Sequence, residues 1–211
     1  MTVTTIAANL AVPDQVVCFP GTWQLYCDLL DNQGDDHNIR ISFDGELIEV
    51  MSPNFPHAEY AKFIARLIYE VCREWGIRLS SAGTTTLLIA SKGGAQPDES
   101  FHLAPRQDPA TNPPPDLVVE VDVTTPRARQ INKLELYARK GVREFWRYLH
   151  HEKSFEAYTL VDDTYQPIET STILNGLPID AIRRQIFAVD LLADDWETIQ
   201  PWQQWLRKNK S

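Results

Sequence analysis

A chain of 211 residues with 43% hydrophobic and 10% aromatic residues is long enough for one globular domain with a sizeable core, and two independent domains are not expected. The net charge of −9 argues against a protein whose whole surface binds nucleic acid, and no apolar run approaches the roughly 18 residues of a membrane span. Three scattered cysteines, with no CxxC pair or Cys/His cluster, argue against a disulfide framework and a structural zinc site. The N-terminus lacks the features of a secretory signal, so we expect a cytoplasmic protein.

The first elements predicted along the chain are two helices on either side of a hairpin. Apolar residues at spacings of three and four predict a short amphipathic helix over residues 21–32. In residues 38–53, two apolar runs meet at Asp44-Gly45, a dipeptide typical of tight hairpin turns. Residues 56–75 keep a period near 3.6 and form the clearest helix of the sequence.

The middle of the chain predicts strands joined without helices. Residues 77–90 indicate one bent strand or a strand pair, and the glycine-containing segment 92–96 indicates a turn. A short strand is expected over 97–104, followed by the proline-rich and irregular segment 105–115. Residues 116–123, DLVVEVDV, are typical of a strand that is buried on both faces.

The remaining elements follow this buried strand. Thr125 and Pro126 favour a helix that starts there and runs to Lys140, where Gly141 ends it. Strands are predicted over 142–151 and 154–160, then an irregular tail with a terminal helix over 196–210.

The order of these elements predicts an α/β (α+β) fold with a mixed sheet between helices. From residue 56 the order is αβββαβ, and the helix between the last two strands implies a parallel crossover, whereas directly joined strands are antiparallel. We expect a core domain over residues 20–165, which includes an N-terminal helix and hairpin. Residues 1–19 are expected to be an N-terminal extension, and residues 166–211 a C-terminal extension packed on the same domain.

Two proline-aspartate pairs raise the question of which acidic residues serve chemistry. Asp116 and Glu120 share a strand face but are four residues apart, roughly 13 Å, so they cannot share one ion. Asp116 is better explained as a residue that starts a strand. Asp98 belongs to another strand and can approach Glu120, because neighbouring strands lie only about 5 Å apart. Asp122, roughly 7 Å further along the strand, can touch a second ion or a bound water.

Glu120 is the strongest anomaly of the sequence. A carboxylate inside the apolar run LVVEVDV costs several kcal/mol unless it is paired, neutral or metal-bound. One interpretation is a salt bridge to Arg127, Arg129 or Lys133. Another is a metal site in which Lys133, on the helix after the strand, reaches back to fix the attacking water or stabilise the transition state. Taken alone, Lys133 is more typical of a solvated helix lysine; beside Asp98 and Glu120 the two interpretations have equal weight.

The basic residues are concentrated in one segment. Residues 127–153 carry a net charge of +5, which leaves −14 for the remainder of the chain. Such a segment is either a solvated helix face or a local nucleic-acid footprint.

The motifs PDESF, PPDLVVEVDVTTP and NKLELYARKGVREFWRY, preceded by FDGELIEVMSPNFPH, resemble the Uma-two family of restriction-endonuclease-like proteins in the PD-(D/E)xK nuclease superfamily. The likeness covers roughly residues 20–165. It implies a restriction-endonuclease-like core with Mg²⁺ or Mn²⁺ as cofactor. Asp98 would be the first acidic ligand and Glu120 the second, with the backbone carbonyl of Val121 as a third donor.

The resemblance also implies roles for residues outside this pair. The superfamily lysine normally stands two residues after the glutamate, where this chain has Asp122, so the role would pass to Lys133. His57 matches a histidine frequent in the family and Glu59 would be an upstream ligand; both are equally typical of a helix start. Arg127 and Arg129 are candidates for contacts to DNA phosphates.

Three functional hypotheses follow. The first is a metal-dependent endonuclease that hydrolyses DNA phosphodiester bonds, acts as a homodimer and has no membrane partner. The second is a nuclease-like fold that no longer cuts and binds nucleic acid or protein, a hypothesis favoured by Asp122 and by the overall acidity. The third is a structural protein with a salt-bridge network around Glu120.

Overall fold

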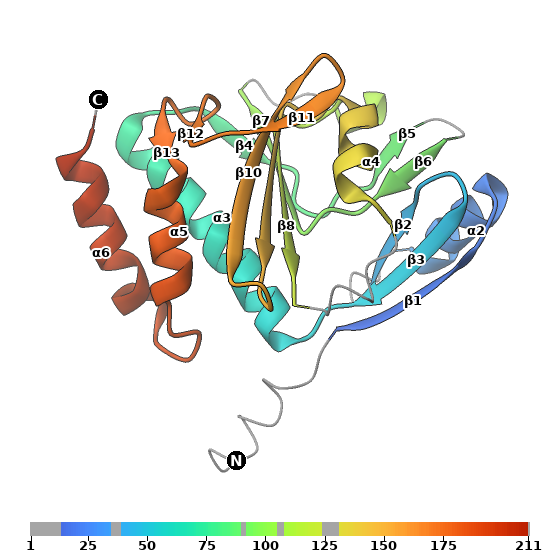
Figure 1. Cartoon of the computed structure of the whole chain (residues 1–211), viewed down its shortest axis with the longest axis horizontal. Coiled ribbons are helices and arrows are strands. Elements are labelled where there is room, and N and C mark those ends of the chain that lie inside the picture. The colour runs from blue at the N-terminus through green and yellow to red at the C-terminus, as the bar shows by residue number, and fades with distance from the viewer. Residues whose placement is uncertain (1–13, 35–38, 90–91, 105–107, 124–130, 211) are drawn as a thin grey trace, which may run out of the picture.

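The fold is taken from a computed structural model, which describes residues 14–34, 39–89, 92–104, 108–123 and 131–210. Within these ranges the chain forms two larger β-sheets flanked by helices (Figure 1). No helix of the described residues is long and apolar enough to cross a membrane.

The larger sheet has six strands in the order β11-β10-β9-β8-β7-β4. The strands are β4 (Leu79–Ser81), β7 (Glu99–Leu103), β8 (Leu117–Asp122), β9 (Glu144–Leu149), β10 (Ser154–Val161) and β11 (Thr164–Pro167). Only the β8–β9 pair is parallel, and α4 (Lys133–Lys140) supplies the crossover between these two strands. The predicted mixed sheet is confirmed. Its elements follow the predicted order αβββαβ as α3, β4, β7, β8, α4 and β9, whereas β5 and β6 belong to the other sheet.

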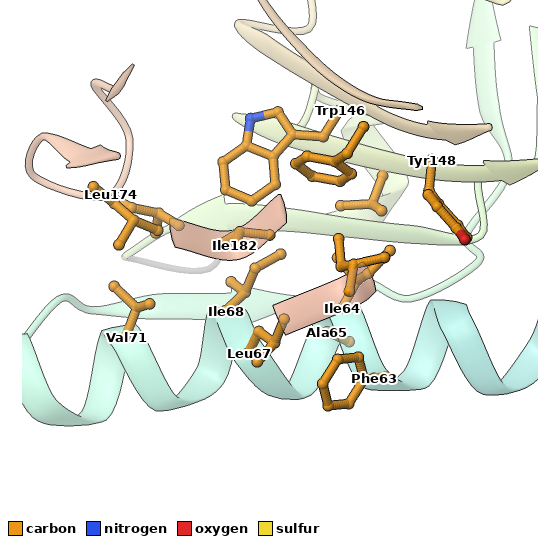
Figure 2. Packing of buried hydrophobic residues seen from close by; sticks show 14 of the residues in the cluster. Phe63, Ile64, Ala65, Leu67, Ile68, Val71, Trp146, Tyr148, Leu174 and Ile182 are labelled. Atoms are coloured by element: carbon orange, nitrogen blue, oxygen red, sulfur yellow. The ribbon is translucent and has the colours of Figure 1, made fainter. Parts of the chain in front are cut away.

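Helices cover both faces of this sheet because the central strand is apolar on both sides. Val119 and Val121 of β8 belong to the core shared with α3 (Phe55–Trp75), α5 (Ile179–Ala188) and α6 (Asp195–Lys208). Val118 belongs instead to the core under α4. Figure 2 shows Ile64, Leu67, Ile68 and Val71 of α3 near Trp146 of β9 and Ile182 of α5.

The long helix α3 has a clear signal at each end. The side chain of Asn54 accepts a hydrogen bond from the backbone N–H of His57, and Pro56 occupies the first turn. Gly76 ends the helix with φ of 73°, a left-handed conformation that glycine adopts without strain. The first turn of α3 lies next to the C-terminal end of β8 (Figure 1). His57 of this turn lines the same pocket as Val121 and Asp122 of β8.

The smaller sheet has five strands in the order β1-β3-β2-β6-β5. Its strands are β1 (Gln15–Pro20), β2 (Arg40–Phe43), β3 (Leu47–Ser52), β5 (Leu87–Ile89) and β6 (Gly93–Ala95), and α2 (Trp23–Gln33) packs on it. The hairpin predicted at Asp44-Gly45 is the β2–β3 pair. The bent segment 77–90 forms β4 and β5, which belong to different sheets.

Three local predictions are wrong. The segment predicted as a turn over 92–96 contains strand β6, whose Gly94 lets the backbone approach Tyr26 and Leu87: an added Cβ would lie 2.5 Å from the Tyr26 hydroxyl oxygen. The helix expected from Pro126 begins at Lys133, because Asn132 provides the N-cap. Residues 124–130 lie outside the described part of the chain.

The third correction concerns the C-terminal tail, which is more regular than expected. It contains α5 and a short pair of strands, β12 (Thr170–Ser171) and β13 (Leu177–Pro178), while a short 3₁₀ helix (Pro109–Thr111) lies in the proline-rich segment. Buried Glu144 anchors the tail to β9 by accepting hydrogen bonds from Ser171, Thr172 and Ile173. Helices α5 and α6 then pack on α3.

Candidate active site

Asp98 and Glu120 are brought together by two neighbouring strands. In the antiparallel β7–β8 pair Glu99 faces Val119, and the same register places Asp98, one residue before β7, beside Glu120. Both carboxylates are buried, with 5% and 7% of their surface exposed. Burial and, to a smaller extent, the charge of Asp98 outweigh the opposite effects of Lys133 and Tyr137, and together they raise the pKa of Glu120 to about 7.

The two oxygens of Asp98 face donors from two other segments. Oδ2 accepts a hydrogen bond of 2.8 Å from the backbone N–H of Val121, and Oδ1 lies 2.8 Å from Nε2 of His57. Burial alone would raise the pKa of Asp98, but the charge and contact of His57 outweigh it, so this pKa is lowered. Asp98 is therefore an ionised carboxylate inside the protein.

His57 lies between two buried aspartates. Its Nδ1 is 2.7 Å from Oδ2 of Asp14, and the other oxygen of Asp14 accepts a hydrogen bond from the backbone N–H of Asn54. Burial lowers the pKa of His57, but Asp98 and Asp14 more than offset this and raise it to about 10. The ring is an imidazolium at neutral pH, and it holds Asp98 in a fixed position.

Lys133 reaches the same region from α4. It is the first residue of that helix, where the helix dipole disfavours a cation. Its Nζ donates a hydrogen bond to Oγ of Ser42 and lies 3.6 Å from Oε1 of Glu49 and 3.9 Å from Oε1 of Glu120. Burial would lower the pKa of Lys133, but the carboxylates, Glu120 first, raise it, so the side chain stays charged.

Tyr137 is the second residue of α4 that contacts Glu120. It lies four residues after Lys133, one turn along the helix, and its hydroxyl donates to the same Oε1 atom of Glu120. Tyr137 is buried, and its pKa is raised by burial and by Glu120, so the hydroxyl stays protonated as a donor. Glu120 is thus held by two side chains of one helix.

These residues border a pocket of about 120 Å³ at the C-terminal end of β8. Its lining combines acidic, basic and apolar side chains: Asp14, Val16, Glu49, Met51, His57, Glu120, Val121, Asp122, Ile131, Asn132, Lys133 and Arg147. Asp98 is not part of this lining, but it contacts two residues that are, His57 and Val121. The predicted Glu120, Lys133, Asp122 and His57 therefore share one pocket, and Asp98 is in contact with its lining.

Other predicted residues lie elsewhere. Glu59 forms an ion pair with Lys62 on α3 and is not in the pocket lining. Arg127 and Arg129 lie outside the described residues. Asp116 accepts hydrogen bonds from the backbone N–H of Leu103 and from Arg143, the structural role expected for it.

Four residues of the site were not foreseen. Ser42 and Glu49 face each other across the β2–β3 hairpin. The predicted turn at Asp44-Gly45 sets this pairing, so the two could have been found as polar residues at facing positions of apolar strands. Tyr137 could have been found from its spacing of four residues from Lys133. Asp14 has no local signal, because its role depends on how β1 meets the first turn of α3.

The donor set fits a magnesium-type ion. Among the residues that the structure describes, no group of three or more His, Cys, Asp or Glu side chains is placed to hold a metal. Mg²⁺ does not need such a group, since it usually binds one or two carboxylates and keeps several waters. Asp98 and Glu120 supply two carboxylates. Oδ2 of Asp98 and Oε1 of Glu120 each accept a hydrogen bond, and a carboxylate oxygen that accepts one hydrogen bond keeps a second lone pair with which it can bind an ion.

Comparison with known proteins identifies the fold and the family of the chain. A crystal structure of a putative nuclease belonging to DUF820 from Anabaena variabilis ATCC 29413 is similar, with a TM-score of 0.55 and 13% sequence identity, over 79% of this chain and 99% of that one. At that identity the likeness establishes the fold. No curated protein matches the chain. The profile of the Uma2 family, described as putative restriction endonuclease, matches residues 23–189. This is the Uma-two family that the motifs resemble, and the chain belongs to it.

Proposed function

We propose that the protein is a metal-dependent endonuclease that hydrolyses DNA phosphodiester bonds. The observation that carries the proposal is one buried cluster that brings Asp98, Glu120 and Lys133 together from three different segments, with Glu120 and Lys133 in the lining of the pocket. Burying two carboxylates and a lysine together costs several kcal/mol unless they pair with other groups or with a bound ion, and such clusters of buried titratable groups are typical of functional sites. Membership of a family described as restriction endonucleases supports the same reaction class.

In this proposal Asp98, Glu120 and the backbone carbonyl of Val121 hold Mg²⁺ or Mn²⁺. A bound ion of this kind orients the phosphate and lowers the pKa of the attacking water. Lys133 acts as a donor and not as a general base, because its raised pKa keeps the ammonium protonated. The ammonium orients the attacking water and stabilises negative charge that develops on the phosphate. His57 keeps Asp98 ionised and in position.

The basic segment contributes less to DNA binding than its charge suggests. Arg143 pairs with Asp116 and Arg147 with Glu156, while Arg139 and Lys140 donate to backbone carbonyl oxygens. Arg127 and Arg129 stay the proposed contacts to DNA phosphates. A homodimer also stays part of the proposal, because two copies of the pocket would cut both strands of a duplex in one encounter.

The test is cleavage of supercoiled plasmid DNA in the presence of Mg²⁺. The wild type should convert the plasmid to nicked or linear product, and excess EDTA should stop the reaction. Lys133→Met should lose this activity by a factor of about 10² or more, because the transition-state donor is missing. Lys208→Met is the matched control, since Lys208 is exposed on α6. Undiminished cleavage by Lys133→Met would contradict the assignment.

A second candidate function is a binding module that does not cut. It is favoured by one observation: both oxygens of Asp98 already face protein donors, and this carboxylate is not part of the pocket lining. This candidate predicts DNA binding that is unchanged by EDTA, with no cleavage by the folded wild type. A gel-shift assay on the samples used for the cleavage test separates the two functions.

A further inference from the structure

The ammonium of Lys133 is held by the smaller sheet as well as by Glu120. Its Nζ donates to Ser42 on β2 and lies closer to Glu49 on β3, at 3.6 Å, than to Glu120, at 3.9 Å. Neither Ser42 nor Glu49 has a part in the proposed binding of the ion. Their contacts with Lys133 join the two sheets at the pocket.

Ser42 and Glu49 form one preassembled surface. They are direct partners in the antiparallel β2–β3 register, so their side chains lie on the same face of the hairpin. Both residues are buried, with 1% and 9% of their surface exposed. Cys18, the partner of Glu49 on β1, lies with its Sγ 3.8 Å from Oε2 of Glu49. Burial raises the pKa of Cys18 to about 11, so it stays a thiol that can donate to this carboxylate.

Glu49 is therefore fixed on both sides. One oxygen accepts from the thiol of Cys18, and the other faces Lys133. A long lysine side chain has several rotamers and loses about 2 kcal/mol of conformational entropy when it is fixed. Ser42 and Glu49 supply an acceptor and a negative charge that select one of these rotamers, at a helix start whose dipole disfavours a cation.

We propose that Ser42 and Glu49 are positioning residues that hold the ammonium of Lys133 in place beside Glu120 for phosphodiester cleavage. The effect on catalysis rests on the proposed endonuclease function, whereas the placement of the ammonium does not. Glu49 and Ser42 act through Lys133 and are not ligands of the ion. Removing either should affect the rate more than substrate binding.

The first experiment needs no activity. In a ¹H–¹⁵N spectrum tuned to lysine side chains, the ammonium signal of Lys133 is assigned by its loss in Lys133→Met. The signal should shift in Glu49→Gln and in Ser42→Ala, and it should keep its position in Glu46→Gln, an exposed neighbour on the same hairpin. An unshifted signal in both Glu49→Gln and Ser42→Ala would overturn the proposal. Ser42→Ala removes a single hydroxyl, so it serves where Glu49→Gln does not fold.

The second experiment measures the catalytic consequence. With folding confirmed by circular dichroism, Glu49→Gln should lower kcat on the order of 100-fold with little change in KM, as expected when a catalytic group is displaced by about 1 Å. Ser42→Ala should act in the same direction, and Glu46→Gln should match the wild type. Wild-type kcat in Glu49→Gln, beside an inactive Lys133→Met, would overturn the proposal. A wild type that does not cleave would instead refute the endonuclease function, and the spectrum would still decide the placement of Lys133.

Discussion

Replacing His57 by glutamine removes the cation that lies between Asp14 and Asp98. The pKa of His57 rises from its ordinary value of 6.5 to about 10 in the folded protein. At about 1.4 kcal/mol for each tenfold change in proton affinity, this rise corresponds to about 5 kcal/mol of stability. Breaking a buried ion pair by removing one partner costs about 3–5 kcal/mol. We therefore expect His57→Gln to lower the free energy of unfolding by about 3–5 kcal/mol at pH 7.

The pH dependence of this loss has a definite sign. Because the pKa of His57 is raised by folding, its stabilising contribution is complete below pH 6.5 and is lost as the pH rises through about 10. The difference in unfolding free energy between wild type and His57→Gln should therefore shrink between pH 7 and pH 10.

The assay is urea denaturation followed by circular dichroism at several pH values across this window. His151→Gln is the matched control, because His151 is exposed and should give a small effect at every pH. A loss below about 1 kcal/mol in His57→Gln, or a difference from wild type that stays constant up to pH 10, would refute the reasoning about the imidazolium.

Three further predictions follow from buried contacts elsewhere. Tyr137→Phe removes a hydrogen bond to a buried carboxylate, so the unfolding free energy should fall by about 1–3 kcal/mol in urea titrations, and no change would argue against the contact with Glu120. Gly94→Ala should destabilise the protein by about 1–3 kcal/mol, because the added Cβ would meet the Tyr26 hydroxyl. Adding Tyr26→Phe to this variant should restore part of the lost stability in thermal unfolding, and no restoration would place the strain elsewhere. Glu144→Ala should lower the unfolding free energy by about 3 kcal/mol or more, since five donors lose their acceptor, and proteolysis within the C-terminal tail should begin earlier than in wild type.

The parts of the site that were predictable depend on local patterns. Glu120 interrupts an apolar run that is typical of a central strand, and that alone marked it as unusual. Asp98 followed because only a neighbouring strand can bring a second carboxylate within reach of Glu120, and the β7–β8 register agrees. The hairpin and the long helix were predictable from a turn dipeptide and from a period of 3.6.

The parts that were missed depend on how distant segments meet. Asp14 acquires its role only where β1 meets the first turn of α3, and Glu49 only where the smaller sheet faces α4. The glycines of strand β6 indicate a turn, because glycine is typical of turns. In the structure, Gly94 instead allows the backbone of β6 to approach Tyr26 closely. The start of α4 is different: Asn132, with Glu135 three residues later, is a capping signal present in the sequence, and it is where this helix begins.

Isothermal titration of Mn²⁺ or Mg²⁺ into the protein shows whether Asp98 and Glu120 hold a divalent ion. The protein samples are the wild type, Asp98→Asn and the exposed control Asp28→Asn, each shown to be folded by circular dichroism. We expect saturable binding by the wild type and the control, and loss of that binding in Asp98→Asn. Folded wild-type protein that binds neither ion, or equal binding by Asp98→Asn, would contradict it.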